Sequence, residues 1–497
     1  MPRNPGAPRA TSSGGLPILA GRVLFGLAAL SLYALSLFWY SVGEPFGPGV
    51  ACGLAFGVFG LHLALGYGRL AALDPLVWVP ISILMFYFGT PVVIEWLGLP
   101  VRGGYDTLEV GNILIINRGY CVALFALTSL IWGIHLAGIR RVDSAPRRDE
   151  TMDRSLGPAA LLYALGALGM VAFGIALVGP STVFGLYEDW WYAKLEGGAD
   201  ERFIDMGTIF AYAGVFALLA TDEPRARWRR YLAYAAAAGI AFVTIQKGDR
   251  SGLVALSVGA GWVYSQRVGR LRWQWVALAA AVGLLAMPVI GEWRAQRRLD
   301  ESQQSTTREL LGKSLVNMGS AVNSIHFTVD LIPKTKDYYW GGTFRYALLS
   351  AIPNITFTRG KWFARGSIED TPSNWLTSII SPTWYGNRGG HGFSMAAEWY
   401  YNFGFAGVWL GMALCGFLLA RVRNAANRSS LMLVFSATLF AGMAIWVRNV
   451  LGAPLKIMIW PVIGLFVIDR MLRLLRGRAA RPRAMGAGPE PHAGFGS

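Results

Sequence analysis

The sequence predicts an all-α membrane protein of about twelve transmembrane helices with one large extracytoplasmic loop. Of its 497 residues, 54% are hydrophobic and only 15% are charged, so the polar side chains are too few to cover a soluble globule of this size. Apolar runs of about 20 residues, the helix length that matches the hydrocarbon core of a bilayer, recur along the chain. One long stretch between two of these runs is too polar to span.

Short polar segments separate the apolar runs and set the expected boundaries. The predicted spans are residues 22–42, 46–66, 75–93, 116–137, 157–179, 204–220, 230–246, 251–265, 275–291, 397–420, 430–447 and 455–470. The chain then divides into a cytoplasmic N-terminal segment (1–21), spans 1–9 (22–291), an extracytoplasmic loop domain (292–396), spans 10–12 (397–470) and a basic, disordered cytoplasmic tail (471–497).

The distribution of basic residues predicts the orientation. The net charge of +16 would suggest nucleic-acid binding, but most of the arginines lie in short segments between spans. With the N-terminus in the cytoplasm, the inner segments collect most of the basic residues outside the long loop, as the positive-inside rule requires. We therefore expect both termini in the cytoplasm and no nucleic-acid partner.

Metal and nucleotide motifs are absent from the sequence. Cys52, Cys121 and Cys415 lie inside apolar runs and are interpreted as small hydrophobic residues. No HExxH, outer Asp-x-Asp, Walker lysine loop or dinucleotide glycine fingerprint occurs. We predict no metal and no cofactor.

The loop combines an amphipathic stretch with many aromatic residues. Apolar side chains at intervals of three or four predict a helix lying on the membrane surface: Leu311, Leu315, Met318, Val322 and Ile325. Aromatic faces stack on sugars, and this favours Trp340, Tyr385 and Tyr400 as glycan-binding residues. The alternative is that such rings form an interfacial belt and local core.

Two residues before and within the tenth span are candidate bases. Of the five histidines, only His326 and His391 fall on the predicted outer side. Imidazole accepts a proton near neutral pH, so His391 is a candidate general base for a hydroxyl group. Glu398 is either paired with Arg388 or Arg448, or is itself the base, because a carboxylate at the start of a span is costly to bury.

Cations at outer helix ends are candidates for binding an anion. Arg250 and Lys247 lie between the two apolar runs 230–246 and 251–265, and Arg448 follows the eleventh span. Guanidinium groups bond two phosphate oxygens at once, so these residues, with Arg388, are predicted to bind a diphosphate. The alternatives are a structural pair with Asp249 or a role in topology alone.

Three stretches resemble the Wzy-type O-antigen polymerases and, more distantly, the O-antigen ligases. They are KGDRSG from Lys247, YYWGGTFRYALLSAIPNITF from Tyr338, and GGHGFSMAAEWYYNFGFAGVWLG from Gly389. The resemblance implies a GT-C-like fold in the bacterial inner membrane with the main loop in the periplasm. In it, Arg250 matches an arginine that contacts the diphosphate, and His391 matches a ligase histidine, although Gly392 and Phe393 follow it here.

The resemblance also implies a reaction. The substrates would be undecaprenyl-diphosphate-linked oligosaccharides as donor and acceptor, joined by inverting transfer without a nucleotide sugar or metal. Membrane lipids are expected partners, and a chain-length regulator is a further one left open. The alternatives are a ligase acting on lipid A-core, a transporter or flippase, and a non-enzymatic scaffold of an envelope assembly. The absence of an internal repeat disfavours transport.

Overall fold

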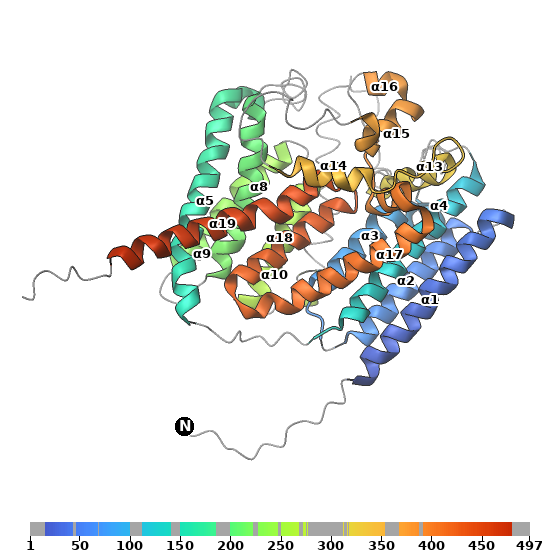
Figure 1. The fold of residues 1–497 in the computed structure, drawn as a ribbon, viewed down its shortest axis with the longest axis horizontal. Coiled ribbons are helices and arrows are strands. Elements are labelled where there is room, and N and C mark those ends of the chain that lie inside the picture. Colours follow the sequence, from blue (N-terminus) through green and yellow to red (C-terminus); the bar gives the residue numbers. More distant parts are fainter. Residues whose placement is uncertain are drawn as a thin grey trace, which may run out of the picture.

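The computed structural model consists of helices wherever it describes regular structure (Figure 1). The described residues are 15–42, 46–67, 69–99, 112–140, 150–184, 199–221, 227–246, 250–267, 272–274, 276, 312, 316, 318–352, 367–386 and 391–479.

A helix covers each predicted span except 275–291, which lies outside the described residues apart from Val276. These helices are α1 (Gly15–Val42), α2 (Pro48–Leu65), α3 (Pro75–Pro91) with the π-helical turn η1 (Val92–Trp96), α4 (Ile113–Ala137), α5 (Glu150–Val178), α8 (Ala199–Ala220), α9 (Arg227–Gln246), α10 (Arg250–Arg267), α17 (Met395–Ala425), α18 (Ser430–Trp446) and α19 (Gly452–Ala479).

Shorter elements connect the long helices. They are α6 (Pro180–Phe184), η3 (Ser320–Val322), α13 (Asn323–Leu331), α14 (Gly342–Ser350), η4 (Ile368–Asp370), α15 (Pro372–Ile380), α16 (Pro382–Gly386) and η5 (Ala426–Arg428). Figure 1 shows α13 to α16 together at one end of the long-helix bundle.

Length and composition make this chain a membrane protein. Within the described residues, six helices are long and apolar enough to cross a bilayer: Pro48–Leu65, Pro75–Trp96, Ile113–Ala137, Leu156–Val178, Phe203–Ala220 and Met395–Arg428. Leu19–Leu35 and Ser430–Trp446 are shorter apolar helices. The count of twelve spans and the side on which the loop lies remain predictions.

Helix α4 lies at the centre of one half of the bundle. Burial reaches 83% of its apolar window, against 28% for those of α2 and α5, because α1, α2, α3, α13 and α17 pack around it. Glycines allow α4 and α17 to cross closely: a Cβ on Gly133 would lie 1.9 Å from the Ala413 carbonyl oxygen. The other half contains α5, α8, α9 and α10, and α18 packs against both halves (Figure 1).

The predicted surface helix is instead part of the core. Met318, Val322 and Ile325 are buried, as their spacing indicates, but α13 packs against α4 and α17, and η3 against α3. Leu311 and Leu315 lie outside the described residues. Helical periodicity identifies the apolar face, but it does not tell whether protein or membrane covers that face.

A buried ion pair links two helices at the end of the bundle opposite α14. Arg423 of α17 is 1% exposed and Asp74, which caps α3 through the Leu76 amide, is fully buried. The Arg423 Nε lies 3.0 Å from Asp74 Oδ2, and an Nη2 bond to the same carboxylate makes the pair bidentate. Arg423 therefore joins α17 to α3.

We expect Arg423→Ala to destabilise the protein by about 3–5 kcal/mol, because it leaves the Asp74 carboxylate buried without its cation. Thermal unfolding in one detergent would measure the change. The matched control is Lys334→Ala, which breaks the exposed pair with Asp330 of α13 and should cost under about 1 kcal/mol. Equal losses in the two variants would contradict this role.

Candidate functional site

Helix α17 is broken at Gly404. Gly404 has φ 64° and ψ −152°, so the helical hydrogen bonds stop there and release carbonyl groups in the preceding turn. Backbone amides from a distant segment take their place. Tyr339 N donates to the Tyr401 carbonyl and Trp340 N to the Asn402 carbonyl, each at 3.0 Å.

The two segments fit together through glycines. A Cβ on Gly404 would lie 2.9 Å from the Tyr338 ring, and one on Gly341 would lie 3.1 Å from the Phe403 ring. Gly341 also has φ 82°, which side chains other than glycine rarely adopt. The YYWGG and WYYNFG stretches, far apart in sequence, are therefore two sides of one interlocked turn.

The Glu398 carboxylate lies just before this break and is almost completely buried. It is 1% exposed, and its Oε2 accepts hydrogen bonds from Trp446 Nε1 at 2.7 Å and from the Leu451 amide at 2.9 Å. The Thr343 side chain is a third hydrogen-bond partner. Asn402 Nδ2 binds both Thr343 Oγ1 and the Glu398 carbonyl oxygen. The carboxylate thus joins α14, α17, α18 and the turn before α19.

All three donors to Glu398 are uncharged. Of the two expected partners, Arg388 lies outside the described residues, and the Arg448 guanidinium lies over the Phe86 ring at 5.7 Å. The position at the first turn of α17 also favours a negative charge, since the helix dipole is positive there. The contacts of Glu398 are therefore those of a hydrogen-bond acceptor that holds segments together, and not those of one partner in an ion pair.

His391 lies in the extended segment before α17 and is only half-buried. Its Nε2 is 2.9 Å from Ser381 Oγ, and its backbone amide donates to Thr377 Oγ1 at 3.0 Å. Gly392 follows with φ 72°, and a Cβ there would lie 3.9 Å from the Arg448 carbonyl oxygen. The structure thus brings His391, Glu398 and Arg448 to the same end of α17.

The start of α10 reaches the same level. Helices α10 and α18 are antiparallel, because Arg267 Nη2 binds Ser430 Oγ and Trp262 Nε1 binds Ser436 Oγ. Both helices rise about 1.5 Å per residue, so the first residue of α10, Arg250, lies level with Arg448 near the end of α18. The side chain of Arg250 is outside the described part, as are Lys247 and Arg388.

The three predicted glycan-binding rings differ in exposure. Trp340, at φ 48° on the turn before Gly341, is 76% exposed, and Tyr385 on α16 is 38% exposed. Tyr400 is fully buried, and its hydroxyl group donates to the Ile332 carbonyl oxygen at 3.4 Å. Trp340 and Tyr385 can meet a sugar, whereas Tyr400 is a packing residue in this structure.

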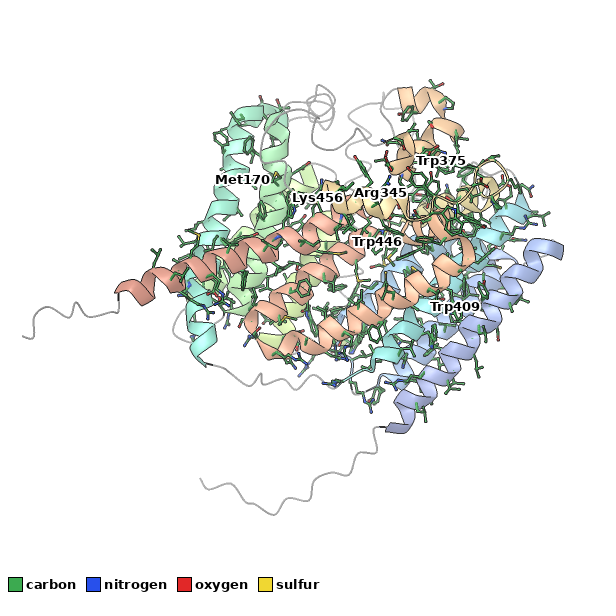
Figure 2. The ribbon with its side chains drawn as sticks, in the orientation of Figure 1. Met170, Arg345, Trp375, Trp409, Trp446 and Lys456 are labelled. Atoms are coloured by element: carbon green, nitrogen blue, oxygen red, sulfur yellow. The ribbon has the colours of Figure 1, made fainter. Side chains whose placement is uncertain are left out.

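The sequence did not single out several cations and polar residues near this end. Arg345 on α14 is exposed, and Figure 2 labels it together with Lys456 of α19 and Trp446 of α18. Helices α14 and α19 pack together, with Trp460 Nε1 donating to the Ala351 carbonyl oxygen. Thr343 and Arg345 fall inside the YYWGGTFRY stretch, so the family resemblance of that stretch could have identified them. No sequence pattern pointed to Trp446, because a tryptophan at the end of an apolar run is typical of the membrane interface.

Lys336 joins the segments around the broken turn through an aromatic cage. Its ammonium group lies within 4.9–5.5 Å of the Tyr339, Trp375 and Tyr401 ring centroids and pairs with Glu369 at 2.7 Å. Tyr339 in turn donates to Asp370 at 2.7 Å. Partial burial, with the nearby carboxylates, raises the pKa of the Tyr339 phenol. The cage fixes η4 and α15 against the broken turn of α17.

His326, expected on the outer side, is fully buried between α13 and α4. Its ring lies 5.1 Å from that of Tyr120, and neither ring nitrogen has a hydrogen-bond partner. Burial lowers the pKa of His326 to about 3. A neutral ring enclosed in this way is not available as a base.

The described residues include no group of three or more His, Cys, Asp or Glu side chains that could hold a metal ion. The arrangement around the broken turn consists of acids, bases, cations and aromatic rings. It offers an accessible imidazole, a buried carboxylate, exposed aromatic rings and arginines from separate helices.

The chain matches one known family. The family model described as O-antigen polysaccharide polymerase Wzy matches residues 185–476. This range is more than half of the chain and includes the broken turn, Glu398, His391 and Arg448. No curated protein and no solved structure matches the chain.

Gly404→Ala should destabilise the protein by about 1–3 kcal/mol or more, since the backbone conformation at Gly404 is nearly exclusive to glycine and the new methyl group would clash with Tyr338. Thermal unfolding in detergent measures it. Gly166→Ala is the control, because α5 leaves open space around that glycine and alanine favours helix. A Gly404 variant as stable as the control would show that the break is not required.

The buried His326 predicts a specific pH dependence. Above about pH 6.5 the ring is neutral in both folded and unfolded chains. As the pH falls, the unfolded chain takes up the proton first, so stability should fall by up to about 1.4 kcal/mol per pH unit. His326→Phe should lose that slope between pH 6.5 and 5, as measured by thermal midpoints. Parallel pH profiles for both proteins would contradict burial of a neutral ring.

Proposed function

Because the chain belongs to the O-antigen polysaccharide polymerase Wzy family, we propose that it joins undecaprenyl-diphosphate-linked oligosaccharide repeat units into a surface polysaccharide. The observation that carries this proposal is the family match across the segments that build the broken turn and its surroundings. We further propose that both termini are cytoplasmic, and that the α13–α16 end faces the periplasm of the inner membrane.

The proposed reaction is a direct displacement without a metal. A base removes the proton from an acceptor hydroxyl group, the oxygen attacks the anomeric carbon of the donor glycan, and the bond to the lipid diphosphate breaks with inversion. Cations stabilise the charge that develops on the departing diphosphate. Holding both lipid-linked substrates side by side supplies much of the rate enhancement.

We assign the base to His391 and a positioning role to Glu398. His391 is half-buried in an extended segment, so an acceptor hydroxyl can approach it, and Ser381 orients its ring. Glu398 is 1% exposed and accepts bonds from Trp446 and Leu451. Its role is to fix the turn that carries Arg448.

Cations from separate elements are proposed to bind the diphosphate. Arg250 begins α10, and Arg448 follows the end of the neighbouring helix α18 at the same level. Lys247 and Arg388 remain candidates from the sequence. Arg345 adds an exposed guanidinium group on α14. Arginine suits this role because its planar fork binds two phosphate oxygens and stays charged. Trp340 and Tyr385 are proposed to stack on the glycan.

An isosteric substitution separates the two candidate bases. The amide oxygen of Glu398→Gln can still accept from Trp446 and Leu451, but an amide cannot take a proton from a hydroxyl group. We expect this variant to keep activity within about tenfold of wild type, and His391→Ala to lose about 100-fold or more. The readout is a polysaccharide ladder formed in detergent from authentic lipid-diphosphate repeat units, without nucleotide or divalent metal.

Each other outcome has a definite meaning. If Glu398→Gln stalls while His391→Ala stays active, Glu398 is the base and the assignment is reversed. If wild type forms no ladder but transfers a glycan to lipid A-core, the protein is a ligase. Thr377→Val replaces the hydroxyl group that binds the His391 backbone by a methyl group of similar size and is the matched control for disturbance of that segment.

A further inference from the structure

A basic cavity lies at the opposite end of α17 from Glu398. It has a volume of about 240 Å³ and is formed where the segment after α4 meets the end of α17 and η5. Three arginines line it, Arg140, Arg421 and Arg428, together with Asn424 and Met432. None of its lining residues is acidic.

The buried ion pair holds this cavity in shape. Arg423, fixed by Asp74, donates through Nη1 to the Arg140 carbonyl oxygen. Asn424 binds the same segment twice: its Nδ2 donates to the Gly138 carbonyl oxygen at 2.7 Å, and its Oδ1 accepts from the Arg140 amide at 3.4 Å. The backbone that carries Arg140 is therefore set by side chains of α17, so the cavity is preformed.

The three guanidinium groups have no carboxylate partner among the described residues. The ion pairs of the described chain involve other side chains, and Arg421 contacts the Phe417 ring at 5.9 Å. Like charges gathered around one cavity repel each other unless an anion lies between them. Arginine in such a set fits a phosphate group.

The membrane-facing surface of α17 leads directly to the cavity. Leu410, Leu414 and Phe417 are 58%, 50% and 37% exposed, and Arg421 follows four residues later. Spacings of four, three and four put these residues on one helix face. An apolar stripe ending in a basic cavity matches the two parts of a lipid, an acyl chain and a charged head group.

We propose that the cavity binds the phosphate head group of an anionic phospholipid, whose acyl chain lies along Leu410, Leu414 and Phe417. The volume supports a head group alone, since sites for whole small-molecule ligands measure roughly 300–1,000 Å³. The stripe favours a lipid over a soluble phosphate. The site is independent of the polymerase activity and lies at the other end of α17.

Native mass spectrometry of the purified full-length protein tests this site. The protein is offered equal amounts of phosphatidylglycerol and phosphatidylcholine with identical acyl chains, and the ratio of retained lipids is measured. Wild type should prefer phosphatidylglycerol. Arg140→Ala and Arg421→Ala should each lower the preference about fivefold, and the double variant about 25-fold, the effect expected for one and two arginines at an anionic lipid.

Arg227→Ala is the matched control, because Arg227 is an exposed arginine at the start of α9 that does not line the cavity. Its preference should equal that of wild type. The proposal fails if the cavity variants keep the wild-type ratio, or if the control falls as far as they do. It also fails if millimolar glycerol 3-phosphate displaces the lipid, since the site would then bind soluble phosphate. Thermal midpoints in phosphatidylcholine verify that each variant is folded.

Discussion

The break in α17 at Gly404 determines how the segments next to it are arranged. Once the helix stops, the Tyr401 and Asn402 carbonyl groups need new donors, and a buried carbonyl without one costs about 1–3 kcal/mol. The turn before α14 offers two successive amides, those of Tyr339 and Trp340, and they donate to these carbonyl groups. Helix α14 begins directly after that turn, so the two backbone hydrogen bonds also bring Thr343 to Glu398. Arg345, two residues later, is exposed.

The opposite end of α17 is fixed by a different interaction. There Arg423 binds Asp74 and the Arg140 carbonyl oxygen, so α3, α17 and the segment after α4 share one buried polar junction. Between the ends, Gly133 and Gly416 allow α4 and α17 to touch backbone to backbone. Helix α17 is therefore broken once and fixed at both ends. It connects the candidate functional site around Glu398 with the basic cavity at its other end.

The sequence predicted the long helices well because an apolar run of about 20 residues has few alternatives in a bilayer. Eleven of the twelve expected spans coincide with helices in the described residues, whereas the span count and orientation rest on the basic-residue pattern. Partners were harder to predict. The helical periodicity identified the apolar face of α13 but not the helices that pack against it. Nothing in EWYYNFG indicated that Trp446 and Leu451 would donate hydrogen bonds to Glu398. Such contacts depend on tertiary packing between segments distant in sequence.

The two buried carboxylates of α17's junctions are stabilised in opposite ways. Asp74 is held by a guanidinium group, which neutralises the charge and makes a rigid joint. Glu398 is held by an indole, a backbone amide and a hydroxyl group, none of which is charged. A carboxylate satisfied by neutral donors occupies no arginine or lysine. Glu398 can therefore hold α14, α17 and α18 together without an arginine or lysine, so this structural role is separate from the proposed binding of a lipid diphosphate by cations.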